Sequence, residues 1–196
     1  MRRKRYSEDK YEEYISLFGK LLLQTMFSQF LRKSGLIRNS GFLEKRAEKM
    51  ISEIEEFVNA EPGSFYRLVI GTDSQTRSIN GHAEIDFVTA IIVHRAGRGA
   101  RYFWKKVKKE MKVPVLRDKI YTETTMSLEA AQDMVPEIRK KISPAKYDFE
   151  IHIDVGPLGP TREMIREVVG MVNGNGFKAK TKPESWGASS VADKHT

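Results

Sequence analysis

Three carboxylates in this sequence occupy positions that suit a divalent cation. Asp73 in LVIGTDSQ and Asp154 in EIHIDVG each end an apolar segment, and Asp193 in SSVADKHT falls within the last four residues. A strand that buries its aliphatic side chains and presents an acid at its tip can hold Mg²⁺, which takes a few oxygen ligands and keeps several waters. Two such strand ends, joined by acids from helices, predict a two-metal site for phosphodiester chemistry.

Each of these residues also has a simpler structural interpretation. Asp73 is equally suited to cap the turn after its strand, Asp154 to serve a turn at Gly156, and Asp193 to be an exposed residue near the chain end. His152 shares a strand face with Asp154 because side chains alternate along a strand. It is interpreted first as a buried structural histidine, and second as a support for a ligand.

A fourth acid is expected from the helix that precedes the second of these strands. Glu123 lies in a helical row with Ser127, Ala130 and Ala131, small residues that allow a helix to approach a sheet closely. Glu129 is the alternative, although its place two residues after Ser127, a possible helix cap, also suits interaction with the helix dipole. Glu123 is preferred as the helix ligand, and Glu129 remains open.

Positive charge is concentrated in one window of the chain. The net charge is +8, from 34 basic and 26 acidic residues. One window, residues 95–117, holds nine basic residues against Glu110 alone, and 9 − 1 = 8 equals the excess of the whole chain. The nine are Arg95, Arg98, Arg101, Lys105, Lys106, Lys108, Lys109, Lys112 and Arg117. Such a window beside candidate metal ligands indicates a polyanionic substrate, with nucleic acid the leading case.

Aromatic residues interleave with lysines inside this window. In GARYFWKKVKK, Tyr102, Trp104 and Lys106 fall on one strand face and Arg101 and Lys105 on the other. Aromatic rings between cationic side chains are typical of a surface that stacks bases and follows a phosphate backbone. The structural alternative is an edge strand that lysines protect against aggregation.

Composition excludes several other classes of protein. The chain has 196 residues and no cysteine, which excludes disulfides, thiol nucleophiles and cysteine-ligated zinc. No run of 18 apolar residues is present, so no membrane association is expected. The basic start MRRKR is followed by YSEDKYEEY where a signal peptide needs an apolar core. We therefore expect a cytoplasmic protein with one compact domain and an extension.

The predicted order of elements is that of a mixed α/β domain. Residues 1–40 are expected to be a basic helical N-terminal extension, and residues 41–196 the domain. The predicted elements are a helix over 43–60, a strand from Tyr66, a hairpin around AGRG, a helix over 122–142 that Pro136 kinks or divides, a strand in YDFEIHIDV, a helix after Thr161, a short strand in GFKAKTKP and a final helical turn. This order predicts a ribonuclease H-like mixed five-stranded sheet flanked by helices.

Several segments resemble a known family. From about Gly41 onward the chain is similar to the bacterial ribonuclease H-like YkuK family, through IGTDSQ, FVTAIIVHRAGRGARYFWKK, IYTETTMSLEAA, IHIDVG and TREMIREVVGMVNGNGFKAKTKPESWGASSVADKHT. The resemblance covers about four-fifths of the chain and excludes the first 40 residues. It implies that acids of the first strand, first helix, fourth strand and last helix bind two Mg²⁺ or Mn²⁺ ions. On this sequence those acids are Asp73, Glu123, Asp154 and Asp193.

The leading hypothesis is a metal-dependent nuclease that acts on RNA, RNA–DNA hybrid or structured DNA. Lys182 and His195 are expected to assist near the scissile phosphate, and the binding surface is expected to hold Arg95, Arg98, Arg101, Tyr102, Trp104, Lys105 and Lys106. The alternative is a non-catalytic module that binds nucleic acid or protein, since fold alone does not assign function. A sugar-kinase or actin-like phosphotransferase is disfavoured because no glycine-rich phosphate loop is present. Residues 8–33 are predicted to pack on the domain or to mediate homo-oligomerisation.

Overall fold

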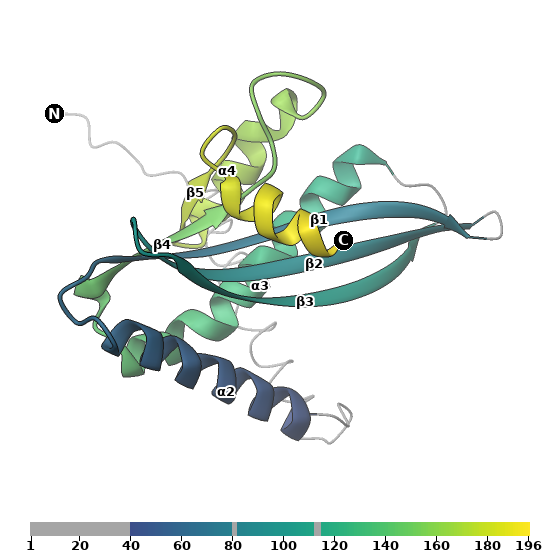
Figure 1. Cartoon of the computed structure of the whole chain (residues 1–196). Helices are drawn as coiled ribbons and strands as arrows, with labels where there is room; N and C mark the ends of the chain where they lie inside the picture. The colour runs from purple at the N-terminus through teal and green to yellow at the C-terminus, as the bar shows by residue number, and fades with distance from the viewer. Residues whose placement is uncertain (1–39, 80–81, 112–114) are drawn as a thin grey trace, which may run out of the picture. The chain divides into compact units, whose positions relative to one another are not determined.

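The computed structural model describes residues 40–79, 82–111 and 115–196 (Figure 1). The chain divides into two compact units, residues 1–47 and 48–196. The predicted extension and the predicted self-association through residues 8–33 lie outside the described residues, apart from Ser40 at the start of the first described helix. The account that follows concerns the second unit.

The core of the second unit is a mixed five-stranded sheet, which confirms the predicted fold class. The strands are β1 (Tyr66–Ile79), β2 (His82–Arg95), β3 (Ala100–Met111), β4 (Tyr147–His152) and β5 (Lys178–Lys180). Their order across the sheet is β3-β2-β1-β4-β5. The first three strands pair antiparallel as a meander, whereas β4 pairs parallel to both β1 and β5. Long crossover connections, as parallel pairing requires, join β3 to β4 and β4 to β5.

The described residues form three α-helices: α2 (Ser40–Asn59), α3 (Leu116–Lys141) and α4 (Ile165–Gly174). α3 begins six residues before the predicted start and runs through Pro136 without a break. Proline removes one helical hydrogen bond. Val135 and Ile138 beside it are buried in the core, and their packing stabilises the continuous helix. No helix in the described ranges has both the length and the apolar character needed to cross a bilayer.

The two faces of the sheet are covered differently. Alternate residues of β1, such as Leu68 and Ile70, enter a large core shared with α3, α4 and residues of α2 from Ile51 onward. On the opposite face, Val88 and Ala90 of β2 pack against the last helical turns of the chain, a π-helical turn at Ala188–Ala192 and a 3₁₀ turn at Asp193–His195. The C-terminal segment therefore forms a layer of its own over the sheet (Figure 1).

Candidate functional site

Asp73 lies in the interior of β1, so its predicted place at a strand tip is wrong. The strand continues to Ile79 because antiparallel pairing with β2 extends to the pair Ile79–His82. The parallel neighbour β4 stops earlier, where His152 pairs with Gly71. Asp73 is therefore two residues beyond the last pair on that side, where the edge of β1 is open. The polar segment SQTRSI that follows Asp73 is part of the strand because β2 provides the hydrogen-bond partners of its main chain.

Asp154 follows the end of β4 by two residues and faces a lysine. One carboxylate oxygen, Oδ2, forms an ion pair with Nζ of Lys182 at 3.0 Å. The other oxygen, Oδ1, is buried and has no hydrogen-bond partner in the described part of the chain. The loop is held by main-chain bonds, including Lys182 N–H to the Val155 carbonyl at 2.8 Å. An orphaned buried carboxylate oxygen is expensive unless a ligand completes it.

Glu123 is buried on the face of α3 that meets β1. The residue is 4% exposed, and its Oε1 accepts from the Ser74 hydroxyl at 2.5 Å. One helical turn later, the Ser127 hydroxyl donates to Thr72 Oγ1 at 2.8 Å, so small residues bring the helix close to the strand. Glu129, the alternative ligand, is exposed on the same helix. The two acids therefore differ sharply in their surroundings.

The segment that carries Asp193 is fixed to the sheet at its start. The Gly187 N–H donates to Nδ1 of His152 at 3.0 Å. A Cβ on Gly187 would lie 2.5 Å from Cγ1 of Val69, so only glycine permits this approach. Trp186 packs edge-on against the His152 ring at 5.2 Å between centroids. Burial lowers the pKa of His152, which agrees with a neutral ring that accepts at Nδ1.

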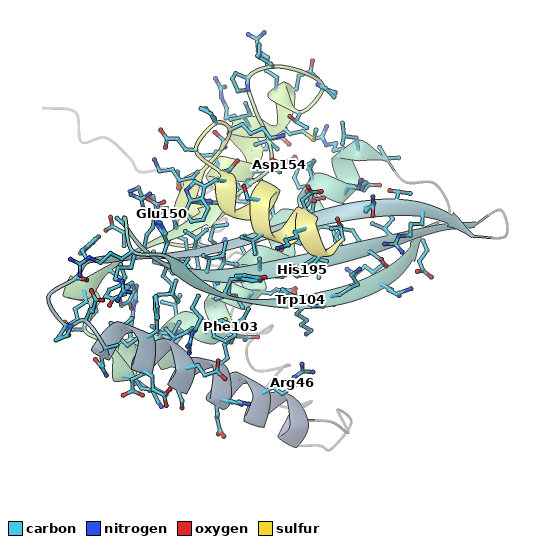
Figure 2. The ribbon with its side chains drawn as sticks, viewed as in Figure 1. Arg46, Phe103, Trp104, Glu150, Asp154 and His195 are labelled. Carbon is cyan, nitrogen blue, oxygen red and sulfur yellow. The ribbon has the colours of Figure 1, made fainter. Side chains whose placement is uncertain are left out.

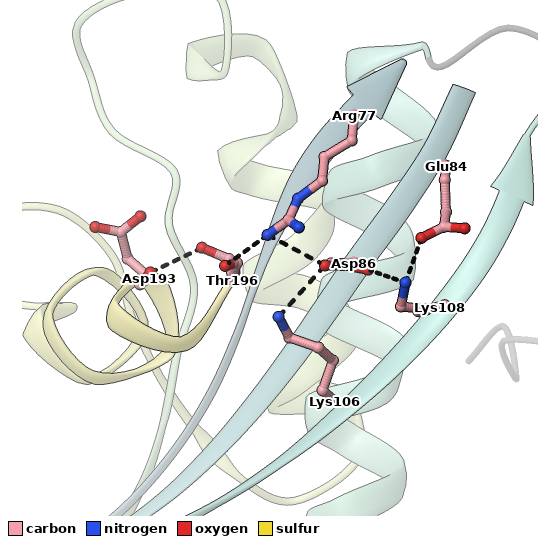
Figure 3. Close-up of polar contacts among 7 residues, drawn as sticks. All are labelled: Arg77, Glu84, Asp86, Lys106, Lys108, Asp193 and Thr196. Carbon is pink, nitrogen blue, oxygen red and sulfur yellow. Dashed lines mark hydrogen bonds and ion pairs between the residues drawn. The ribbon is translucent and has the colours of Figure 1, made fainter. Parts of the chain in front are cut away.

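The same segment is held again at its end (Figure 3). The Arg77 guanidinium donates to the Thr196 main-chain oxygen at 3.2 Å and lies 3.5 Å from the Asp86 carboxylate. The Thr196 hydroxyl in turn donates to the Asp193 carbonyl at 2.7 Å. Asp193 itself is exposed. Its position therefore depends on anchors on both sides rather than on its own burial.

The acids influence one another electrostatically although they come from four separate segments. Burial, with smaller contributions from the charges of Asp154 and Asp193, raises the pKa of Asp73 to about 6. Burial also raises the pKa of Glu123 to about 8, with smaller contributions from Asp73 and Asp154. The charge of Lys119 opposes both shifts. Perturbed carboxyl groups gathered in this way are characteristic of functional sites.

Sequence reasoning missed two residues here, Lys119 and Ser74. The Lys119 ammonium donates to the Ser74 carbonyl at 3.4 Å, and the Ser74 hydroxyl binds Glu123. A signal was available, because Lys119 lies one helical turn before Glu123 and Ser74 directly follows Asp73. It was hidden because the predicted helix began only at Thr122.

The donors suit a hard cation, but the described residues do not form a complete coordination group. All four acids offer carboxylate oxygens, which Mg²⁺ and Mn²⁺ favour. The partnerless Oδ1 of Asp154 is a donor atom that a cation would satisfy. Within residues 40–79, 82–111 and 115–196, no three acidic or histidine side chains converge closely enough to hold a metal ion. The chemistry of the set therefore fits a metal, while the described side chains are not gathered around one point.

Most basic side chains of the predicted window are paired with acids. Arg95 and Arg98 both contact Glu61 at 2.8 Å. Arg95 pairs in register with Tyr66, seven residues from Asp73, which is ~24 Å along the strand. The structure thus places Arg95 and Arg98 away from the acids.

The remaining pairs involve both faces of β3 and the first turn of α3. Arg101 lies 3.9 Å from Glu53, Lys106 lies 3.3 Å from Asp86, Lys108 lies 2.6 Å from Glu84, and Arg117 lies 2.9 Å from Glu167. Lys105 is exposed and pairs with Thr89 on the α3 side of the sheet. Lys112 falls outside the described residues. Only Lys106 shares a cross-strand row with Asp73, through Val88.

Comparison with known proteins agrees with this architecture. Residues 49–196 match the family model described as Ribonuclease H-like. The chain belongs to the ribonuclease H-like family. It is also 33% identical over 172 residues to the Uncharacterized protein YkuK of Bacillus subtilis (strain 168), a match that covers 83% of this chain and 98% of that protein. The predicted resemblance to the YkuK family is confirmed.

One solved structure shows a much weaker similarity. The crystal structure of NurA bound to dAMP and manganese matches with a TM-score of 0.30 and 14% identity. The match covers 72% of this chain and 34% of the NurA chain, so this chain spans about a third of that protein. Similarity at this level bears on neither the fold nor the site.

Proposed function

We propose that this protein is a divalent-cation-dependent nuclease that hydrolyses phosphodiester bonds in RNA, RNA–DNA hybrid or structured DNA. The observation that carries the proposal is a pair of buried acids: burial first, and repulsion by neighbouring acids such as Asp154 second, raise the pKa of Asp73 to about 6 and that of Glu123 to about 8. Such repulsion is relieved when cations occupy the site. Membership of the ribonuclease H-like family supports this chemistry.

Asp73, Glu123, Asp154 and Asp193 are the proposed ligands of two Mg²⁺ or Mn²⁺ ions. When bound, such a pair of cations activates water for in-line attack and stabilises the leaving oxygen. The acids contribute hard oxygen donors, and Asp154 Oδ1 is the donor atom that the protein leaves without a partner. Glu123, rather than the exposed Glu129, is the helix residue that faces Asp73 electrostatically.

Cationic side chains beside the acids are proposed to hold the substrate backbone. The Lys182 ammonium contacts Asp154 and remains half-exposed, so it can exchange that contact for a phosphate oxygen. Lys106 lies on the same sheet face as Asp73, whereas the predicted backbone contacts Arg101 and Lys105 lie on the opposite face of β3. The predicted roles of Arg95 and Arg98 are less direct, because both side chains are paired with Glu61 at the far end of β1.

Cleavage by acid-to-amide variants tests the proposal. Labelled single-stranded RNA, single-stranded DNA, RNA–DNA hybrid and hairpin DNA would be incubated with Mg²⁺ or Mn²⁺ and resolved on gels. Asp73→Asn and Glu123→Gln should abolish cleavage. Asp148→Asn and Glu129→Gln, exposed acids on β4 and α3, are the matched controls and should cleave normally. Cleavage by Asp73→Asn at the wild-type rate, with its fold unchanged by circular dichroism, would overturn the proposal.

The second candidate function is a non-catalytic binding module, and one observation favours it. No three acids among the described residues lie around a common point. This alternative expects salt-sensitive binding to nucleic acid or protein and no cleavage with any metal. A Mn²⁺ titration followed by electron paramagnetic resonance separates the two candidates, because only the nuclease needs Asp73-dependent ion binding.

A further inference from the structure

Two large aromatic side chains stand exposed on the edge strand of the sheet. Tyr102 is 41% exposed and Trp104 is 48% exposed. Both lie on the face of the sheet that carries Asp73: Trp104 pairs with Ala90, which pairs with Gly71 of β1. Lysines would be sufficient to protect an edge strand from aggregation, whereas an exposed indole adds apolar surface and gives no such protection. The exposed rings therefore indicate a ligand-binding surface.

A third ring joins them from the C-terminal turn (Figure 2). The His195 imidazole stacks on Trp104 with 4.6 Å between centroids and 13° between planes. It also contacts the Tyr102 ring at 5.7 Å. His195 lies two residues after Asp193, so this set of rings, the aromatic platform (Tyr102, Trp104 and His195), adjoins the acidic site directly. The Nε2 atom of His195 is buried and has no hydrogen-bond partner among the described residues.

The strand that carries the platform is basic. β3 holds Arg101, Lys105, Lys106, Lys108 and Lys109 against Glu110, and 5 − 1 gives a net charge of +4. Lys106 and Lys108 lie on the face of the platform, where they pair with Asp86 and Glu84, and the other three cations lie on the opposite face. A flat aromatic surface on a cationic strand suits a ligand that is both planar and anionic. Nucleic acid combines these features, because every base has a π-face and every nucleotide a phosphate. An apolar protein segment would gain nothing from this charge.

We infer that the aromatic platform stacks an unpaired base of the substrate beside the scissile phosphate. The inference rests on the proposed function and narrows its substrate class to single-stranded segments, whether of RNA or DNA. A base within a duplex is already stacked on both faces, whereas a base in a loop, a flap or a free strand can lie on a ring. Tyr102 and Trp104 lie two residues apart, so their rings provide two stacking positions ~7 Å apart along the strand.

Abasic substitution tests this inference. A series of single-stranded oligonucleotides would each lack one base, and binding would be measured by fluorescence anisotropy in EDTA, where cleavage cannot occur. In the wild type, loss of the stacked base should weaken binding by about 5- to 150-fold, the range for base–aromatic stacking. Trp104→Ala should weaken binding of the intact strand similarly and become insensitive to the abasic position. Trp104→Phe should restore part of the sensitivity.

Phe65→Ala supplies the matched control, since Phe65 is 54% exposed but lies directly before Tyr66, at the end of β1 away from the acids. It should bind intact and abasic strands as the wild type does. An RNA series and a DNA series run in parallel show which strand the site prefers.

The failure of this inference is distinguishable from failure of the proposed function. The inference would be overturned if Trp104→Ala lost the same binding affinity for the intact strand as for the abasic strand. It would also be overturned if the wild type bound duplex and single strand with equal affinity. Neither result would bear on metal-dependent cleavage. Sensitivity to the abasic position in a protein that never cleaves would support the platform and remove the nuclease.

Discussion

Replacement of Glu123 by glutamine should remove a pH dependence from the stability of the protein. Burial and neighbouring acids raise the pKa of Glu123 to about 8 from an ordinary 4.5. The folded state therefore keeps a proton that the unfolded chain has lost, and the free energy of unfolding falls as pH rises from about 4.5 to about 8. Asp73 acts in the same direction between 3.8 and about 6.

The size of the effect follows from the shift. At about 1.4 kcal/mol per pH unit, the Glu123 carboxyl alone should cost about 3–4 kcal/mol of stability between pH 5 and pH 8. For a domain of this size, that corresponds to a change in Tm on the order of 10 °C. In Glu123→Gln the amide stays neutral at every pH, and its oxygen can still accept from the Ser74 hydroxyl. The variant should therefore gain stability relative to the wild type as pH rises.

Urea unfolding in EDTA, followed by tryptophan fluorescence at pH 5 and pH 8, measures this difference. Glu129→Gln, on the exposed side of the same helix, should keep the wild-type pH dependence. Mn²⁺ should reduce the wild-type loss at pH 8, because cation binding favours the deprotonated acids. If wild type and Glu123→Gln lose the same stability between pH 5 and pH 8, the electrostatic account of the site is refuted.

Two further predictions concern the anchors of the C-terminal segment. Gly187→Ala should lower the free energy of unfolding by about 1–3 kcal/mol, because its Cβ would lie 2.5 Å from Val69 Cγ1; an unchanged urea midpoint would contradict the packing described. Arg77→Gln should weaken Mn²⁺ binding by about 5- to 10-fold, which corresponds to about 1 kcal/mol, the net contribution of a typical hydrogen bond, because Thr196 and with it Asp193 lose an anchor. Calorimetric titration of Mn²⁺ measures this, and Arg77→Lys should recover part of the affinity.

The types of element and the identity of the fold class could be predicted from the sequence because local patterns determine them. Alternating apolar residues in HAEIDFVTAIIVHR and GARYFWKKVKK, separated by AGRG, predicted the hairpin that the structure contains as β2 and β3. Gly97 and Gly99 in that turn have φ of 73° and 93°, a conformation that glycine adopts without strain. A small-residue row on one helix face also favoured Glu123 over Glu129, and Glu123 is the buried acid of the two.

Lengths and partners were decided by tertiary structure. β1 continues past Asp73 because β2 pairs with SQTRSI, and nothing local to that polar segment requires a strand. The sequence of residues 95–117 predicted unpaired positive charge. In the structure, Glu61, Asp86 and Glu84 from other segments form ion pairs with much of it. Ion pairs between residues far apart in the chain leave no local trace.

The sequence by itself determined which acids, rings and lysines are present and which of them share a strand or helix face. Only the tertiary structure decided that the pairing of β4 with β1 ends two residues before Asp73. It also decided that Gly187 brings the last turn against Val69 and that His195 stacks on Trp104. The physical reason is that periodicity is a property of neighbouring residues, whereas a site assembled from four segments depends on register and close packing across the whole sheet.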